Sequence, residues 1–264
     1  MEVSRRVGLA LSGGGALGAA HIGVLEVLEE NGVIPCCVSG TSAGSAVGLA
    51  YCAGLPVERL RELALEMRWS RLGRMVPPRN GFFDGQRMED YVRRVIGDRR
   101  FEDLEKPFAC VATDILRDEV VILRSGPVAP AIRASCAFPG IFTPVEKGER
   151  LLVDGGLMCN LPVAVLTEMG AEYTIAVDLL SPKPRVRRMP ETVFEMWFQS
   201  LRILMFNTGH EAELADVVIA PDVGEFSGFD LRHAEALIAA GRLAAAEHIV
   251  QIRRDLGLEE LGGS

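Results

Sequence analysis

The fold of this 264-residue chain is decided by residues 7–18, which read VGLALSGGGALG. Val7–Leu11 is a short, continuous apolar run, which is typical of a strand buried on both faces of a sheet. Glycines follow at once, and the apolar positions of residues 19–31 then predict a helix with one buried face. We expect a second strand at residues 33–38. The chain therefore begins as a strand, a glycine-rich loop, a helix and another strand.

The same alternation of apolar runs and helical patterns continues along the chain. Further strands are expected at residues 108–113, 120–123, 151–153, 173–177 and 217–220. Further helices are expected at residues 45–53, 56–69, 86–96, 129–137, 192–207 and 231–254, with a proline- and glycine-rich loop at 75–85. These patterns predict an α/β fold with a central, mostly parallel sheet and helices on both faces. No repeat or long linker divides the sequence, so we expect one domain over residues 1–264.

Composition narrows the function classes. Hydrophobic residues make up 48% of the chain and aromatic residues only 6%, so the core must be mainly aliphatic. The formal charge of −8 argues against binding of nucleic acid, because phosphates repel an acidic surface. The six cysteines show no metal-binding or paired spacing and are interpreted as reduced core residues. With no signal peptide and no apolar run of about 18 residues, we expect a cytoplasmic protein, with peripheral membrane contact left open.

Gly40-Thr41-Ser42-Ala43-Gly44 matches the pattern G-x-S-x-G between the second strand and the following helix. Such a turn must be tight and strained, because it lifts a serine hydroxyl above the edge of the sheet. The small residues Gly40 and Gly44 allow the turn to close, and the helix start adds positive potential for an oxyanion. The alternative is a glycine turn whose serine merely caps a helix. The strand–turn–helix context favours Ser42 as a nucleophile.

The base that would serve Ser42 is less obvious. An α/β-hydrolase order of Ser42, Asp154 and a later histidine (His210, His233 or His248) is formally available, but only two strands precede Ser42. His21 lies inside the first helix, where a packed or hydrogen-bonded histidine is the ordinary role.

Asp154 is the better candidate, because it ends a short strand and is followed by Gly155 and Gly156. Burial beside a hydroxyl would raise the pKa of its carboxyl. An ordinary Asp-Gly turn explains the same spacing about as well.

The glycine loop also fits G-x-G-x-x-G, which is the fingerprint of a dinucleotide site. Such a site needs an acidic residue at the end of the second strand, and this chain has Val38-Ser39-Gly40 there. The loop and the serine turn follow adjacent strands and can face one another. Backbone N–H groups of Gly13, Gly14 and Gly15 would then form an oxyanion hole opposite Ser42. We favour acyl transfer over dinucleotide binding, because only acyl transfer also accounts for Ser42.

In combination, these motifs resemble the patatin-like phospholipase family, in particular its bacterial branch. The resemblance rests on the glycine loop through Gly18, the serine turn, and Asp154-Gly155-Gly156. Two further segments agree, Arg133–Pro139 with the family's R-x-S-x-A-x-P and Asn160–Val163 with its N-x-P-V. All occur in the family's order and spacing.

The resemblance implies a three-layer α/β/α fold and a Ser42–Asp154 dyad that needs no catalytic histidine, metal or cofactor. It also implies hydrolysis of lipid or fatty-acyl esters through an acyl-enzyme. One departure is Leu17, where many members carry arginine or lysine, so the oxyanion hole here would rely on backbone donors. Phospholipase, lysophospholipase, esterase and acyltransferase activities are not separated by these motifs. A catalytically idle, lipid-binding scaffold is the main alternative, ahead of a dinucleotide-binding protein.

Two segments bear on the substrate. The predicted helix at residues 192–207 carries ten apolar side chains. They suit either a buried core helix or a helix of which part lines an acyl channel or touches a bilayer. Just before it, a basic loop stands out in an acidic chain. The loop consists of Lys183, Arg185, Arg187 and Arg188. It is either a solvated loop or a contact for anionic lipid.

Overall fold

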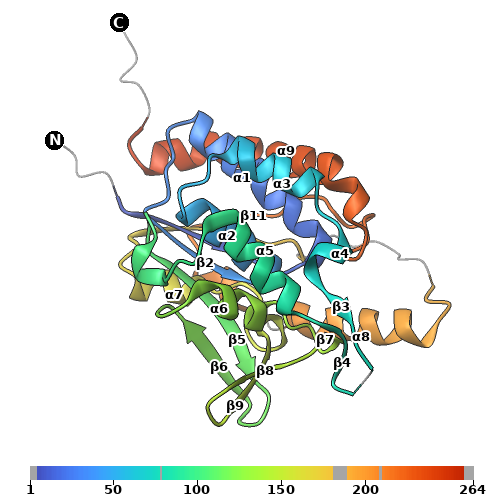
Figure 1. The fold of residues 1–264 in the computed structure, drawn as a ribbon. Helices are drawn as coiled ribbons and strands as arrows, with labels where there is room; N and C mark the ends of the chain where they lie inside the picture. Colours follow the sequence, from blue (N-terminus) through green and yellow to red (C-terminus); the bar gives the residue numbers. More distant parts are fainter. Residues whose placement is uncertain (1–4, 78, 181–188, 208–209, 259–264) are drawn as a thin grey trace, which may run out of the picture.

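The computed structural model describes residues 5–77, 79–180, 189–207 and 210–258. Its centre is a sheet with the strand order β11-β10-β1-β2-β5-β9-β8, in which β6 also pairs with β5 (Figure 1). The strands of this sheet are β1 (Val7–Leu11), β2 (Cys37–Thr41), β5 (Phe108–Asp114), β6 (Glu119–Leu123), β8 (Val145–Lys147), β9 (Arg150–Asp154), β10 (Tyr173–Val177) and β11 (Val217–Ile219).

The sheet is mostly parallel. From β11 through β10, β1 and β2 to β5, each neighbouring pair runs parallel, with Leu9 opposite both Ile175 and Val38. Antiparallel pairing is confined to the end of the sheet that holds β6, β9 and β8. The predicted α/β class with a central, mostly parallel sheet is confirmed.

Helices cover this sheet on two faces (Figure 1). They are α1 (Ala19–Glu30), α2 (Ala43–Cys52), α3 (Val57–Leu65), α4 (Trp69–Leu72), α5 (Gln86–Ile96), α6 (Val128–Ser135), α7 (Val163–Glu168), α8 (Val193–Asn207) and α9 (Ala234–Asp255). Side chains alternate along β1, as they must in a strand: Leu9 and Leu11 join the larger core, and Ala10 joins a smaller one with Leu166 of α7. The layers are therefore helix, sheet and helix.

Two helices of the larger core touch backbone to backbone. A Cβ placed on Gly23 of α1 would lie 2.0 Å from the carbonyl oxygen of Ile238 in α9. A Cβ on Gly241 of α9 would lie 1.9 Å from the carbonyl oxygen of Ala20. Both positions therefore require glycine. Helices α1 and α9 together cover one face of the parallel strands.

A second sheet of three strands lies beside the first, and the sequence patterns predicted none of these strands. Its strands are β3 (Arg74–Met75), β4 (Gly81–Asp84) and β7 (Gly140–Phe142), in the order β3-β4-β7. Residues 75–85 were expected to form only a loop. The strand β4 exists because it pairs with β7, almost sixty residues later, with Gly81 opposite Gly140 and Phe83 opposite Phe142.

The helix α8 differs from a buried core helix. Trp197 and Met205 face the protein, but Val193 and Met196 are 88% and 55% exposed, and Ile203 and Leu204 are also exposed. No helix in the described ranges is long and apolar enough to cross a bilayer. The basic residues Lys183, Arg185, Arg187 and Arg188 lie outside the described residues.

Candidate active site

Ser42 occupies a strained turn between β2 and α2. Its φ of 52° lies in the left-handed region, which non-glycine residues adopt at a cost and mainly at functional sites. The turn closes only because its neighbours are small. A Cβ on Gly44 would lie 2.2 Å from the Leu11 carbonyl oxygen, and one on Gly40 would lie 2.7 Å from the Gly44 backbone. The sequence pattern G-x-S-x-G thus has its expected structural context.

Two strands bring Ser42 and Asp154 together along one edge of β5. Strand β2 pairs with the first half of β5, where Thr41 lies opposite Val111. Strand β9 approaches from the opposite direction and pairs with the second half, where Asp154 lies opposite Ala112. The other edge of β5 is taken by β6. The ends of β2 and β9 therefore meet head to head, and the next residue after Thr41 is Ser42.

The two side chains form a short hydrogen bond. Ser42 Oγ donates to Asp154 Oδ2 at 2.6 Å, and the Gly156 N–H donates to Asp154 Oδ1 at 2.9 Å. Gly155 lets β9 end this close to its neighbours, since a Cβ there would lie 2.4 Å from the Val111 carbonyl oxygen. The carboxylate is thus oriented from one side by its own turn and presents its second oxygen to the serine.

Burial makes the Asp154 carboxyl a stronger base than an ordinary aspartate. The residue is only 1% exposed, and loss of solvent raises the pKa of its carboxyl to about 6. The hydrogen bonds from Ser42 and Gly156 stabilise the charged form and limit this rise. At neutral pH the carboxylate is therefore ionised, yet basic enough to accept a proton from a reacting hydroxyl.

The histidines of the described chain have other contacts. His21 is fully buried, and its Nε2–H donates to the Ser12 carbonyl oxygen at 2.8 Å, which holds the start of the glycine loop. Burial lowers the pKa of its imidazole to about 4. His233 and His248 bond residues of their own C-terminal segment. The side chain of His210 lies outside the described residues. His21 thus has the ordinary packed and hydrogen-bonded role.

The glycine loop lies against the serine turn. A Cβ on Gly13 would lie 3.3 Å from Ser42 Cβ, and one on Gly18 would lie 2.7 Å from Ala43 Cβ. The N–H of Gly13 donates to the Asn160 carbonyl oxygen at 3.1 Å, so this group already has an acceptor. Within the part of the chain that the structure describes, the N–H groups of Gly14 and Gly15 have no acceptor.

Ser135 is a site residue that no local pattern identifies. Its side chain is fully buried, and its Oγ accepts the backbone N–H of Ser42 at 3.0 Å. The strained backbone of Ser42 is therefore held by a hydroxyl that is 93 residues distant in the sequence. The only signal for Ser135 was its place in the segment Arg133–Pro139, which carried the family resemblance. The side chain of Leu17 in the glycine loop is apolar and buried, so it brings no positive charge to the site.

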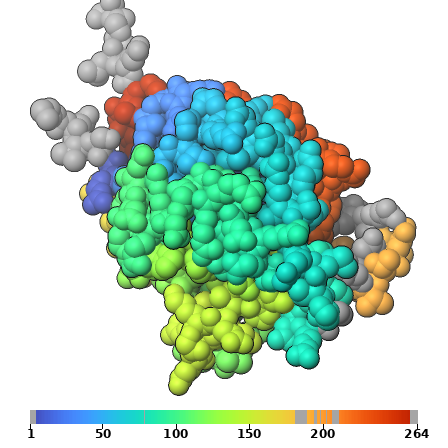
Figure 2. Space-filling model, in the orientation of Figure 1, coloured from blue at the N-terminus to red at the C-terminus, as the bar shows by residue number. Residues whose placement is uncertain are grey.

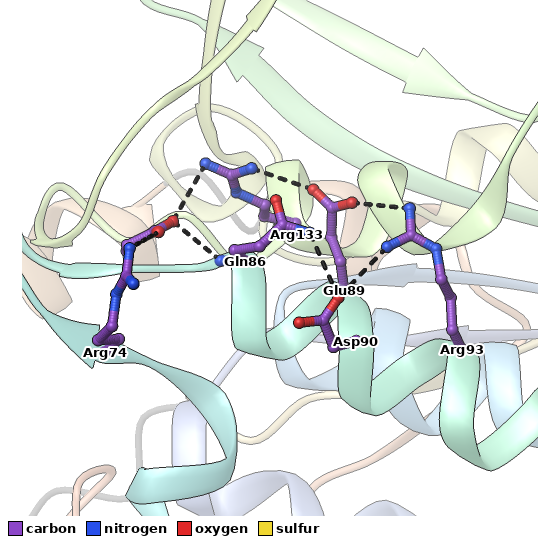
Figure 3. Close-up of polar contacts among 7 residues, drawn as sticks. Arg74, Gln86, Glu89, Asp90, Arg93 and Arg133 are labelled. Carbon is purple, nitrogen blue, oxygen red and sulfur yellow. Dashed lines mark hydrogen bonds and ion pairs between the residues drawn. The ribbon is translucent and has the colours of Figure 1, made fainter.

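A partly buried ionic network, centred on the buried Glu89, holds the helix that carries Ser135 (Figure 3). Arg133 Nη1 donates to Glu89 Oε1 at 3.0 Å, and Glu89 Oε2 accepts from Arg93 Nη2 at 3.0 Å. Arg133 Nη2 also lies 3.7 Å from Asp84 Oδ1 at the end of β4. Removing Arg133 would leave the buried carboxylate of Glu89 with one partner fewer. The network therefore ties α6 to α5 and to the small sheet.

A large apolar cavity of about 1030 Å³ opens at Ser42. Its walls near the serine include Gly14, Gly15 and Ala43, whereas Gly13 does not line it. Farther away it is lined by aliphatic and aromatic side chains of α3, α4, α5 and α8, among them Leu60, Trp69, Met88, Val92 and Met205. Its volume lies at the upper end of the usual range for ligand pockets. Such a space suits a long apolar group attached to a reactive polar one.

Cys136 lies between the cavity and the serine turn, with its Sγ 3.9 Å from Ser45 Oγ. Burial raises the pKa of this thiol to about 12, so it stays protonated and unreactive. All six cysteines are free. Among the described residues, no three His, Cys, Asp or Glu side chains are grouped as metal ligands would be.

Comparison with known sequences places the chain in a family. The patatin-like phospholipase family matches residues 9–167. An uncharacterized NTE family protein of Mycobacterium tuberculosis is 31% identical over 91% of this chain and 46% of its own length. Another from that organism is 38% identical over 67% of this chain and 49% of its own length. Patatin-like phospholipase domain-containing protein 6 of Mus musculus is 36% identical over 66% of this chain, but over only 13% of its own length. The chain spans about half the length of the mycobacterial relatives.

Solved structures agree on the fold. VipD from Legionella pneumophila superimposes with a TM-score of 0.60 over 94% of this chain and 67% of its own, at 14% sequence identity. The type III effector protein ExoU superimposes with a TM-score of 0.52 over 94% of this chain and 53% of its own, at 15% identity. These likenesses establish the architecture, and the family match covers the serine turn, Asp154 and the glycine loop that build the site. The chain therefore belongs to the patatin-like phospholipase family.

Proposed function

We propose that this protein hydrolyses lipid or fatty-acyl esters, with Ser42 as nucleophile and Asp154 as its only side-chain base. One observation carries the proposal: the 2.6 Å hydrogen bond from Ser42 Oγ to a buried carboxylate at the end of a large apolar cavity. Membership of the patatin-like phospholipase family supports the same reaction class. The interpretation of residues 1–264 as one acyl-hydrolase domain of a cytoplasmic protein stays a prediction.

The proposed reaction has two halves. Asp154 Oδ2 takes the proton of Ser42 Oγ as that oxygen attacks the ester carbonyl, and the protonated carboxyl then gives the proton to the departing alcohol. Water next attacks the acyl-enzyme. Asp154 accepts one proton of this water and returns it to Ser42 as the carboxylic acid leaves.

The oxyanion of each tetrahedral intermediate needs donors that are not already used. Of the three glycines predicted for this role, Gly13 donates to Asn160, whereas Gly14 and Gly15 line the cavity and have no acceptor in the described chain. We therefore assign the oxyanion hole to the N–H groups of Gly14 and Gly15, with the start of α2 adding positive potential. Leu17 supplies no charge, so the backbone carries this stabilisation alone.

The cavity supports an apolar acyl chain as the group bound beside Ser42. Each methylene that leaves water for an apolar wall contributes about 0.8 kcal/mol. If this energy is expressed in the transition state, kcat/KM should rise by up to roughly fourfold per methylene until the cavity is filled. A lipid substrate also implies peripheral contact with a membrane.

The test is hydrolysis of p-nitrophenyl esters of increasing chain length by wild type, Ser42→Ala and Asp154→Asn. We expect kcat to fall by a factor of about 10⁴ in both variants, with KM little changed. Asp114→Asn is the matched control, because Asp114 is equally buried but pairs with Arg117 instead of Ser42. It should lose stability and keep kcat.

Near-normal turnover by Asp154→Asn would refute the dyad. A wild type that hydrolyses no ester and does not react with a fluorophosphonate probe would instead be a lipid-binding scaffold. A thermal shift produced by dinucleotides, and abolished by substitution in the glycine loop, would favour the dinucleotide alternative.

A further inference from the structure

Residues 68–87 differ in charge from the rest of the chain. They contain Arg68, Arg71, Arg74, Arg79 and Arg87 but a single acidic residue, Asp84, in a protein whose formal charge is −8. The segment runs through α4, β3 and β4 to the first residues of α5. A local excess of four positive charges in an acidic protein requires either a structural or a binding explanation.

Internal ion pairs account for only part of this excess. Arg74 pairs with Asp84 and Arg71 with Glu66, both at the surface. Arg79 and Arg87 are exposed and have no acidic partner among the described residues. These two guanidinium groups are therefore available to an external anion.

Large apolar side chains lie among these arginines. Met75 of β3 is 78% exposed and Phe82 of β4 is 48% exposed. We call the exposed side chains of Met75, Arg79, Phe82 and Arg87 the hairpin surface. Guanidinium groups interspersed with exposed apolar side chains are what an interface between water and anionic lipid favours.

The outer side of α8 continues the apolar part of this surface. Val193, Met196, Ile203 and Leu204 recur at helical spacing and are exposed, with Ser200 as the polar residue between them. The opposite side of α8 packs on the small sheet, because Trp197 lies against Gly140 of β7, the strand that pairs with β4. Figure 2 shows residues 68–87 in blue-green and α8 in orange projecting at the same side of the molecule.

This side of the molecule also contains part of the cavity wall. Trp69 and Leu72 of α4, Phe142 of β7 and Met205 of α8 all line the cavity that opens at Ser42. The elements that present the hairpin surface and the exposed side of α8 therefore also supply part of the apolar cavity wall, so a lipid bilayer resting there would lie beside that wall.

We propose that the hairpin surface and the exposed side of α8 dock on an anionic lipid bilayer, from which the acyl chain enters the cavity. This inference rests on the proposed function. An anionic bilayer fits better than a protein partner or a second copy of the chain. Arg79 and Arg87 have no acidic partner in the part of the chain that the structure describes, and a second copy would present the same positive charge to them.

Vesicle co-sedimentation tests the proposal, using phosphatidylcholine alone or with about one third phosphatidylglycerol as the anionic lipid. Arg79→Gln/Arg87→Gln should weaken binding to the anionic vesicles by roughly twenty-fivefold, or about fivefold for each charge removed. It should leave binding to neutral vesicles unchanged. Met75→Ser/Phe82→Ser should weaken binding to both vesicle types.

Matched control variants lie elsewhere on the surface. Arg59→Gln/Arg124→Gln removes the same charge, and Leu243→Ser/Val250→Ser removes similarly exposed apolar side chains from α9. Both controls should bind like wild type. Every variant should hydrolyse a soluble short-chain ester at the wild-type rate, because none of these residues lines the cavity. If the wild type itself does not hydrolyse the soluble ester, the proposed function is contradicted, whereas the docking surface is not.

Three results would overturn the proposal. The first is equal loss of vesicle binding in the hairpin variants and in their controls. The second is a wild type that hydrolyses soluble ester but binds neither vesicle type. The third is a wild-type dimer that dissociates on Met75→Ser/Phe82→Ser, which would identify the surface as a protein interface.

Discussion

The serine turn and the hairpin surface are built by opposite strategies. At the turn, a Cβ added to Gly40 or Gly44 would lie within 2.7 Å of backbone atoms. Almost no other residue therefore fits at these two positions. At the hairpin, Met75 and Phe82 point into solvent, and many side chains would fit. Chemistry at Ser42 depends on positions accurate to a fraction of an ångström, whereas contact with a bilayer depends only on the character of the surface. Substitutions should therefore affect the two regions very differently.

The largest effect is expected at Gly44. Helix propensity alone would make Gly44→Ala stabilising by about 1 kcal/mol, because Gly44 lies in α2. The new Cβ would, however, lie 2.2 Å from the Leu11 carbonyl oxygen in a buried strand, and such overpacking costs about 3 kcal/mol. We expect net destabilisation in urea unfolding and nearly complete loss of esterase activity.

Gly48→Ala is the control, one turn along the same helix. Its Cβ would contact side-chain atoms of Phe108 and Val38 at 3.0 Å, and these can shift. Equal losses of stability in the two variants would show that the backbone contact at Gly44 is not the cause.

The next effect is expected at Ser135. Ser135→Ala removes the acceptor of the Ser42 N–H, so the strained turn relaxes and Ser42 Oγ moves relative to Asp154. A displacement of about 1 Å is enough to reduce kcat by roughly 10²-fold. KM should change little, because Ser135 does not line the cavity.

Ser135→Thr keeps the hydroxyl and should restore most of the activity and the rate of labelling by a fluorophosphonate. If alanine and threonine variants are equally slow, then Ser135 matters only for packing.

The buried, ionised carboxylate of Asp154 should lower the free energy of unfolding. Because burial raises the carboxyl pKa from 3.8 to about 6, the folded state binds its proton more tightly than the unfolded chain does. Stability from this group is therefore fully present below pH 4 and is lost as the pH rises through 6. Asp154→Asn carries no charge and should be more stable than wild type by about 2 kcal/mol at pH 7.5.

Urea unfolding at pH 4 and pH 7.5 measures this difference, which should be small at the lower pH. Wild-type kcat/KM should also fall about tenfold for each pH unit below 6, as the carboxylate of Asp154 becomes protonated. A stability difference that does not change with pH would contradict the assigned pKa.

The smallest effect on stability is expected at the hairpin. Met75→Ser and Phe82→Ser should each change the free energy of unfolding by less than about 0.5 kcal/mol, since both side chains are already exposed. Thermal or urea unfolding checks this. A loss above about 1 kcal/mol would mean that the hairpin packs against a part of the chain and is not a free surface.

The two regions also differ in how well the sequence predicts them. Strand β1, the turn at Ser42 and the glycine loop follow from contiguous patterns, because local rules of strand burial and turn geometry suffice there. The second strand was expected at residues 33–38 but occupies Cys37–Thr41, where its register is set by pairing with Gly8–Leu11. Strand β4 was missed because its partner β7 is remote in the sequence.

Within the site, the same distinction holds. Ser42 and Asp154 were both named from the sequence, but their 2.6 Å contact arises from the way two strands share β5. The hydroxyl of Ser135 and the Arg133–Glu89 pair are likewise contacts between distant segments. The hydrogen bond from Gly13 N–H to the Asn160 carbonyl oxygen is also a tertiary contact. The sequence alone could therefore not show that Gly13 differs from Gly14 and Gly15 as a donor to an oxyanion.

The head-to-head meeting of β2 and β9 has a consequence for the order of synthesis. A chain leaving the ribosome completes the serine turn first, and the carboxylate follows 112 residues later. Until β9 pairs with β5, half of one edge of β5 has no neighbouring strand, and Ser42 has no carboxylate beside it. The proposed ester hydrolysis therefore requires a closed sheet, because an unfinished chain carries Ser42 without Asp154 beside it.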